Sequence, residues 1–202
     1  MNSITLLIID ESGSMAGMES YVNEIYLGIV NQIKREISES PELIQFIEVW
    51  TFEGSNIQQR IPFMQLTESL VPDNLNYQPG MSTPLFDAVG ISVSGMKSRL
   101  KSVESLREAQ VNVSIITDGL ENSSVEYTAY QLAKLIEELK QKEWNFSYYG
   151  TNHDVFTAAK EISIDDVKAF EKSAKGFRNN AKRMVAYSYA NKMEYLDKLK
   201  KK

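Results

Sequence analysis

Three short segments of the sequence carry oxygen-bearing side chains at a spacing that suits cation binding. They are residues 10–14 (Asp-Glu-Ser-Gly-Ser), residues 82–84 (Ser-Thr-Pro) and residues 117–119 (Thr-Asp-Gly). The candidate ligands in them are two carboxylates and three hydroxyls: Asp10, Ser12, Ser14, Thr83 and Asp118. Hard oxygen donors without an imidazole or a thiolate favour Mg²⁺ or Mn²⁺ over zinc or copper. Ser82 is an alternative to Thr83 as the ligand from the second segment.

The number of carboxylates in this set indicates what a bound cation would do. A divalent cation held by two carboxylates is formally neutral, and hydroxyls or water add no charge. Such a cation keeps enough Lewis acidity to attract one more anion, for example a carboxylate from another protein. The alternation at 10, 12 and 14 around Gly13 allows a tight turn to aim all three side chains inward. The pattern therefore predicts a cation site with one position left for a partner.

Alternating strands and helices are predicted around these segments. The expected strands cover residues 4–9, 43–52, 57–66, 111–117 and 144–149. Four helices are expected to accompany these strands. The first carries the apolar stripe 18–37, and the second begins at Thr83-Pro84. The third runs from a capping box of Ser123 and Glu126 to about Lys142, and the fourth covers 154–162. Residues 4–9 are almost wholly apolar, which is typical of a strand buried on both faces of a parallel sheet. Pro62 cannot donate a ladder hydrogen bond, so the strand 57–66 belongs at a sheet edge.

This alternation predicts an α/β fold: a doubly wound, mostly parallel open sheet with one antiparallel edge strand and a long C-terminal helix. Such sheets bind ligands at the carboxyl ends of their strands. Residues 10–14 and 117–119 follow two expected strands directly, and residues 82–84 open a helix on the same side. The three segments are therefore expected to converge at one end of the sheet.

The charge of the chain divides it into two parts. Residues 1–167 hold 11 Lys and Arg against 24 Asp and Glu, a net charge of −13, whereas residues 168–202 hold 11 against 3, a net charge of +8. The second part has an apolar stripe that drifts as on a single amphipathic helix, and Gly176 marks a candidate break. We expect a domain over 1–167 and a basic helical segment over 168–202 that packs on it.

The ordered set Asp10-Glu11-Ser12-Gly13-Ser14, Thr83 and Thr117-Asp118-Gly119 resembles the metal-ion-dependent adhesion site (MIDAS) of von Willebrand factor A (vWA) domains. The resemblance covers about residues 3–165, and residues 80–88 are similar to the intracellular bacterial members. It implies a Rossmann-like vWA fold, with Ser12, Ser14 and Thr83 bound directly to the cation and two aspartates bound directly or through water. It further implies a protein partner that presents Asp or Glu to the metal.

Other functions are less consistent with the residues. A Mg²⁺-dependent phosphatase of the haloacid type would need Asp where Ser12 stands, and the sequence has no phosphate-binding loop. The only histidine lies in Thr151-Asn152-His153-Asp154, which is interpreted as a helix-capping turn. A non-catalytic interaction domain is therefore preferred over a phosphatase-like enzyme. Binding of nucleic acid or an acidic partner through the basic helix is a further alternative, although the acidic body would repel a polyanion. Glu11, Glu53 and Glu121 are interpreted as solvated loop carboxylates.

The composition sets the remaining expectations. The chain has 202 residues, 43% of them hydrophobic and none of them cysteine, which predicts a globular protein of a reducing compartment without disulfides or thiolate metal sites. No apolar stretch approaches the roughly 20 residues that a membrane span needs, and Met1-Asn2-Ser3 lacks the basic region of a secretory signal. We therefore expect a cytoplasmic protein. The partner, the choice between Mg²⁺ and Mn²⁺ and the oligomeric state stay open.

Overall fold

One sheet organises the computed structural model, which describes residues 2–67, 75–151, 154–171 and 173–200. Within these residues six strands follow the order β3-β2-β1-β4-β5-β6. They are β1 (Asn2–Asp10), β2 (Ile44–Glu53), β3 (Asn56–Gln65), β4 (Gln110–Ile116), β5 (Asn145–Gly150) and β6 (Asp166–Ala169). β3 runs antiparallel to β2, and the other neighbours are parallel. The predicted open, mostly parallel sheet with one antiparallel edge strand is confirmed.

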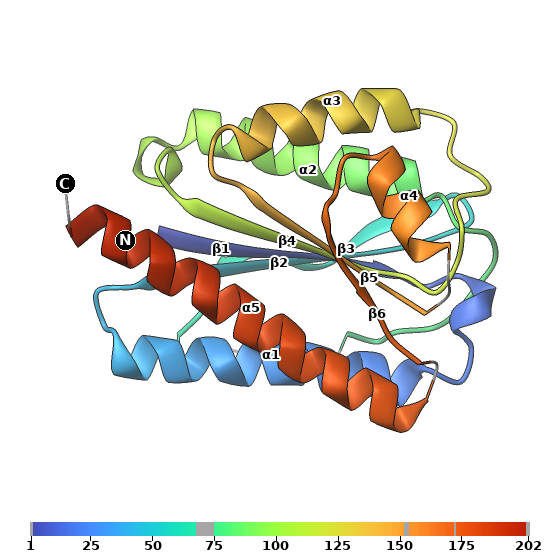
Figure 1. The fold of residues 1–202 in the computed structure, drawn as a ribbon, viewed down its shortest axis with the longest axis horizontal. Coiled ribbons are helices and arrows are strands. Elements are labelled where there is room, and N and C mark those ends of the chain that lie inside the picture. The colour runs from blue at the N-terminus through green and yellow to red at the C-terminus, as the bar shows by residue number, and fades with distance from the viewer. Residues whose placement is uncertain (1, 68–74, 152–153, 172, 201–202) are drawn as a thin grey trace.

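Helices cover both faces of the sheet (Figure 1). On one face lie α1 (Glu19–Glu39) and α5 (Ala174–Lys200), and on the other lie α2 (Leu85–Ser102), α3 (Ala129–Lys140) and α4 (Val155–Glu161). Two short 3-10 turns, η1 (Gly13–Met15) and η2 (Glu104–Leu106), precede α1 and β4. In the part of the chain that the structure describes, no helix is long and apolar enough to span a membrane.

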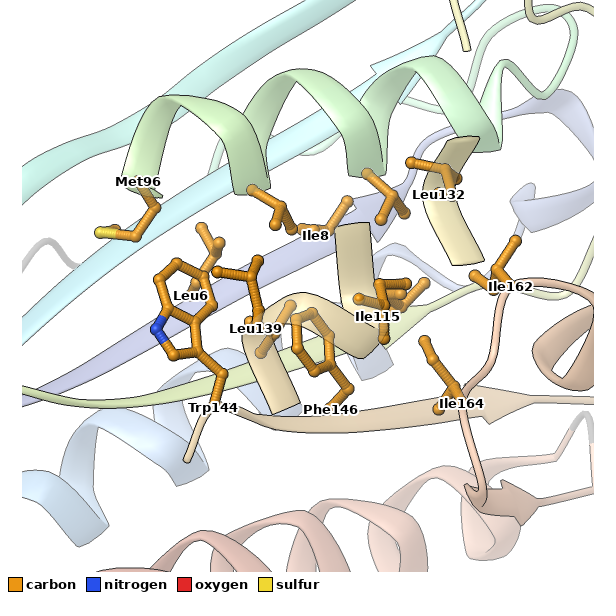
Figure 2. Close-up of a cluster of buried hydrophobic side chains, with 14 of the residues drawn as sticks. Leu6, Ile8, Met96, Ile115, Leu132, Leu139, Trp144, Phe146, Ile162 and Ile164 are labelled. Carbon is orange, nitrogen blue, oxygen red and sulfur yellow. The ribbon is translucent and has the colours of Figure 1, made fainter. Parts of the chain in front are cut away.

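The side chains of β1 show why its sequence is apolar throughout. Ile4, Leu6 and Ile8 belong to the core beneath α2 and α3, whereas Leu7 and Ile9 belong to the core beneath α1, because successive side chains of a strand point to opposite faces. Figure 2 shows the first of these cores, which extends from Leu132 and Ile162 to Trp144. With both faces covered, the alternation of polar and apolar residues disappears.

The start of α3 differs from the prediction. The helix begins at Ala129 rather than at a capping box of Ser123 and Glu126, and its N-cap is Thr128, which forms a capping box with Gln131. Asp87, from α2, accepts hydrogen bonds from the backbone N–H groups of residues 125, 126 and 127. This carboxylate satisfies the donors that a helix start would otherwise use and holds the segment as a loop.

The start of α2 and the last strand also refine the prediction. Pro84 is the N-cap of α2, one residue before the helix proper, whereas it was expected at the first helical position. β6 was not expected, because its four residues, Asp-Val-Lys-Ala, contain no apolar run. It pairs with β5, so the expected boundary between residues 167 and 168 falls inside a strand of the sheet.

The C-terminal helix packs against the domain rather than extending from it. α5 runs through Gly176 without the expected break and lies along α1 (Figure 1). Lys192, one of the basic residues of the segment 168–202, is 1% exposed and donates to Glu36 of α1 and Gln45 of β2, each at 2.8 Å. This cation is therefore part of the α1–α5 interface and is unavailable to a polyanion.

Candidate metal centre

The three predicted segments meet at the carboxyl ends of β1 and β4. β1 and β4 are parallel neighbours in which Ile9 pairs with Ile116, so Asp10 and Thr117 leave the sheet side by side. The turn η1 follows Asp10 and carries Ser14, and the segment before α2 brings Thr83 to the same end. The topology thus explains why residues more than 100 positions apart share one site.

Asp10 is the buried carboxylate of this end. It is 0% exposed, its Oδ1 accepts from the backbone N–H of Ser12 at 2.7 Å, and its Oδ2 accepts from the Thr117 hydroxyl at 2.5 Å. Burial raises the pKa of Asp10, the nearby Asp118 raises it further, and the hydrogen bonds from Thr117 and Ser12 oppose the increase. A buried carboxylate in this position favours a cation beside it.

The two serines connect Asp10 to the second carboxylate. The Ser12 and Ser14 hydroxyl oxygens lie 3.1 Å apart, and the Ser14 hydroxyl donates to Asp118 Oδ1 at 2.6 Å. Ser12 is buried, whereas Ser14 is exposed. The candidate ligands therefore include a buried hydroxyl, that of Ser12, and a solvent-facing hydroxyl, that of Ser14. The site is open to solvent on the Ser14 side.

Gly119 marks the point on which the three segments converge. A Cβ placed on this residue would lie 3.1 Å from Thr83 Oγ1, 3.4 Å from Ser14 Oγ and 3.5 Å from Asp10 Oδ2. The Thr83 hydroxyl has no hydrogen-bond partner among the residues that the structure describes. Ser82 contributes its carbonyl oxygen to Gly54 N–H at 2.9 Å. Glycine at 119 thus leaves room where oxygens from all three segments come together.

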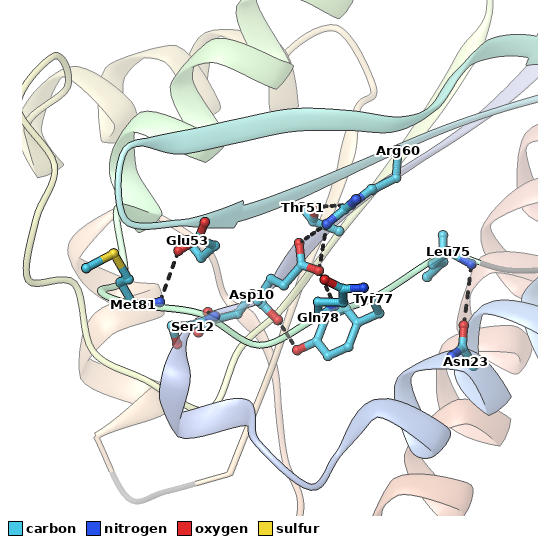
Figure 3. Close-up of polar contacts among 11 residues, drawn as sticks. Asp10, Ser12, Asn23, Thr51, Glu53, Arg60, Leu75, Tyr77, Gln78 and Met81 are labelled. Atoms are coloured by element: carbon cyan, nitrogen blue, oxygen red, sulfur yellow. Dashed lines mark hydrogen bonds and ion pairs between the residues drawn. The ribbon is translucent and has the colours of Figure 1, made fainter.

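The segment after β1 is held in place by a partly buried ion pair (Figure 3). Glu11 is 0% exposed and accepts from Arg60 of β3 through both carboxylate oxygens, at 2.7 and 2.8 Å, and from the Gln78 backbone N–H. The Tyr77 hydroxyl donates to the Asp10 carbonyl oxygen. The interpretation of Glu11 as a solvated carboxylate is wrong, because Arg60 from the edge strand and the 77–78 segment enclose it.

The carboxylates of Glu53 and Glu121 also accept hydrogen bonds from the backbone. Glu53 accepts from the Met81 backbone N–H at 3.0 Å, and Met81 in turn accepts from Gly13 N–H at 3.0 Å. Glu121 accepts from the N–H groups of Ser123 and Phe86, each at 2.8 Å. Both carboxylates are partly exposed and also accept backbone N–H groups, so the expected solvated side chains have a structural role in addition.

Sequence reasoning missed these supporting residues because they carry no local signal. Arg60 lies 49 positions from Glu11, and the residue pattern of its edge strand does not indicate this contact. Nothing in the sequence around Tyr77 indicates that its hydroxyl donates to Asp10. The Thr117 hydroxyl is the exception, since it directly precedes a candidate ligand. The expected capping turn at Asn152 and His153 lies outside the described residues.

The donor set is consistent with a hard divalent cation. Within the described ranges no three His, Cys, Asp or Glu side chains gather as a metal site, so a cation here would depend on hydroxyls in addition to the two carboxylates. The close approach of Thr83, Ser14 and Asp10 to one point beside Gly119 is the arrangement that such ligation needs. The residues present therefore fit Mg²⁺ or Mn²⁺.

Comparisons with known proteins identify the fold. No protein-family model and no curated protein matches the sequence. Among solved structures, the chain is similar to the VWA domain of SpRpn10, with a TM-score of 0.57, 12% identity and coverage of 88% of this chain and 92% of that one. It is also similar to proximal thread matrix protein 1 from the mussel byssus, with a TM-score of 0.57, 14% identity and 93% of this chain covered. This chain spans 46% of that longer protein.

Within the described residues, the strand order, the antiparallel edge strand and the similarity to the SpRpn10 VWA domain define a Rossmann-like vWA fold.

Proposed function

We propose that this chain is a non-catalytic, divalent-metal-dependent protein-interaction domain. In this proposal Mg²⁺ or Mn²⁺ is held by five residues: Asp10, Ser12, Ser14, Thr83 and Asp118. A protein partner supplies an Asp or Glu side chain to the remaining coordination position. The main support for this proposal is that side-chain oxygens of Thr83, Ser14 and Asp10 converge beside Gly119 on a vWA-like fold.

The charges of the site support an acidic partner. The two carboxylates, Asp10 and Asp118, balance one divalent cation, and the other three ligands are neutral hydroxyls. A bound cation supplies Lewis acidity that attracts an anionic oxygen. The neighbouring Glu11 is already neutralised by Arg60, so it does not add to the negative charge of the site. An acidic partner would therefore bind in the presence of metal and be repelled by Asp118 without it.

The surrounding chain supports binding by holding the ligands in fixed positions. Asp10 is oriented by Ser12 N–H and Thr117, and the turn that carries the two serines is fixed by the Gly13–Met81 hydrogen bond. Side chains that are positioned before binding lose less conformational entropy when a ligand arrives. The loops beside them are then available to recognise residues that flank the partner's carboxylate.

Metal binding by single-hydroxyl variants tests the proposal. Electron paramagnetic resonance of Mn²⁺ titrated into chelator-stripped protein, up to millimolar metal, should show bound Mn²⁺ that added Mg²⁺ displaces. Ser12→Ala and Thr83→Val should each weaken binding about tenfold or more, as loss of a ligand requires. Ser38→Ala, an exposed hydroxyl on α1, serves as the matched control and should leave binding unchanged. Equal Mn²⁺ affinity in all four proteins would refute the proposed site.

A further inference from the structure

A cavity lies at the opposite end of the sheet from the candidate metal centre. It has a volume of about 360 Å³ and is lined by the C-terminal ends of α2 and α3, the segment that enters β4, and Tyr195 of α5. β4 and β5 begin here, at Gln110 and Asn145, whereas the candidate ligands follow the ends of β1 and β4. A volume in this range accommodates a small molecule.

The floor of this cavity is apolar and aromatic. Leu100, Leu139 and Trp144 line it and are 7%, 1% and 6% exposed, because each also belongs to the core beneath α2 and α3. Figure 2 shows Trp144 at one end of that core, with its indole nitrogen on the side away from Phe146. No residue that the structure describes accepts a hydrogen bond from this indole N–H. The floor thus offers an apolar and aromatic surface.

Four cations line the cavity. The side chains of Lys101 and Arg107 have no hydrogen bond or ion pair with the described residues. Lys97 and Lys142 also line it, and both are held by the Glu138 carboxylate, at 2.6 and 2.7 Å. These two ammonium groups lower the pKa of Glu138 to about 2. Lys101 and Arg107 are therefore the cations still available to a ligand.

The acidic residues of the rim lie on the α5 side. Glu108 and Glu143 line the cavity near Tyr195, whose pKa is raised by burial and then by these two carboxylates. The Tyr195 hydroxyl donates to the Glu108 carbonyl oxygen at 2.9 Å and closes this side. The lining therefore has four cations and two carboxylates, and both carboxylates lie near Tyr195.

We propose that this cavity binds a small amphiphilic anion, whose flat apolar body lies on Leu100, Leu139 and Trp144. Its negatively charged oxygen group would face Lys101 and Arg107. The two lining cations without an ion-pair partner, Lys101 and Arg107, favour a ligand with an anionic group. The apolar floor excludes a fully polar anion such as free phosphate as the preferred ligand. This site is independent of metal binding at the other end of the sheet.

A pair of dyes that differ in charge tests the proposal. Anilinonaphthalene sulfonate (ANS) has an aromatic body with one anionic group, and N-phenyl-naphthylamine (NPN) is the same body without that group. Both are titrated into the native full chain, and their fluorescence reports binding. The structure predicts that ANS binds at least about tenfold more tightly than NPN, the difference that one charge-assisted contact provides.

Variants of the rim and of the lining locate the binding. Lys101→Glu/Arg107→Glu should weaken ANS binding at least about tenfold and leave NPN binding unchanged. Arg35→Glu, an exposed charge reversal on α1, is the matched control and should change neither. Ala109→Phe places a ring in the cavity and should reduce binding of both dyes. Circular dichroism and the unfolding midpoint establish that each variant is folded.

Three results would overturn the proposal. Equal affinity for the two dyes would make the cavity an apolar docking site without preference for an anion. Unchanged ANS affinity in the Lys101→Glu/Arg107→Glu variant would place the anion away from these cations. ANS binding that persists in folded Ala109→Phe protein would place the dye outside the cavity.

Discussion

The two ends of the sheet offer opposite chemistry. At the carboxyl ends of the strands, oxygen atoms of Asp10, Ser14 and Thr83 converge, and backbone hydrogen bonds fix the loops that carry them. At the amino ends, an apolar floor is bordered by the unpaired cations Lys101 and Arg107. The first end suits a cation and the second suits an anion with an apolar body. One sheet thus separates two proposed sites of opposite charge preference.

The difference teaches how a parallel sheet distributes its loops. Because neighbouring strands point the same way, the segments that leave β1 and β4 meet at one edge and the segments that enter β4 and β5 meet at the other. The leaving segments are rich in Asp, Ser, Thr and Gly, whereas the entering segments follow helix ends that carry Lys and Arg. Basic residues in the last turn complement the negative end of a helix dipole, which explains why cations gather there.

The largest effect should come from the buried ion pair that holds α5 along the sheet. Lys192→Met leaves Glu36 buried without its cation, which should lower the free energy of unfolding by about 3–5 kcal/mol in urea titrations. The double variant Glu36→Gln/Lys192→Met should recover most of this loss. Lys182→Met changes an exposed cation of the same helix and should stay within about 0.5 kcal/mol of the parent. If Lys192→Met were as stable as Lys182→Met, the pair would not anchor α5.

The next largest effect concerns the cation at the carboxyl end. Asp10→Asn keeps the shape of the side chain and removes one of two negative charges, so Mn²⁺ affinity should fall about a hundredfold. Asp165→Asn, an exposed carboxylate 89% accessible to solvent, is the control and should retain the parent affinity. Mn²⁺ resonance spectra at fixed metal distinguish the two. If both variants lost Mn²⁺ affinity to a similar extent, the loss would be a general effect of net charge and not evidence for a site at Asp10.

A smaller effect is expected from filling the space beside Gly119. Gly119→Ala places a methyl group 3.1 Å from Thr83 Oγ1 and 3.4 Å from Ser14 Oγ, so Mn²⁺ affinity should drop about tenfold as these oxygens are displaced. Gly28→Ala is the matched control, because a Cβ on this α1 residue meets nothing within 4 Å. It should leave metal binding unchanged and stabilise the helix by up to about 1 kcal/mol. Full metal affinity in Gly119→Ala would move the site away from this point.

The smallest effect is a pH dependence that burial of Asp10 produces. The pKa of Asp10 is raised above its ordinary value of 3.8. At pH values just above 3.8, the Asp10 carboxyl therefore stays protonated in the folded, metal-free chain and is ionised in the unfolded chain. The contribution of Asp10 to stability therefore decreases as pH rises through this interval. Metal affinity should change in the opposite direction, because only the ionised carboxylate binds a cation. Urea titrations of metal-free parent and Asp10→Asn protein between pH 3.5 and about 6 should differ in slope, and parallel curves would contradict the assignment to Asp10.

The core of the fold and the candidate ligands were accessible from the sequence because their signals are local. The apolar run 4–9 predicts a strand buried on both faces, and Pro62 predicts the edge position of β3. Both predictions are confirmed. The five candidate ligands were found from residue types and short spacings at strand ends, and the structure brings them to one end of the sheet. Their binding of a metal stays a prediction.

What the sequence did not reveal depends on partners far away along the chain. The predicted capping box at Ser123 would use the Glu126 N–H group, which instead donates to Asp87, 39 positions away. β6 has no apolar pattern of its own and forms because β5 offers an unpaired edge. Arg60 encloses Glu11 from 49 positions away. Each of these outcomes is a competition between hydrogen-bond partners that only the folded chain places together.

The sequence by itself determined the α/β alternation, the antiparallel edge and the chemical nature of the candidate cation site, since periodicity and residue type are properties of short segments. Only the tertiary structure decided that Lys192 is buried against Glu36, 156 positions away, and that helix ends and α5 enclose a cavity at the amino ends of the strands. Burial and ion pairing are energies of contact between segments, and no local pattern records which segments will meet.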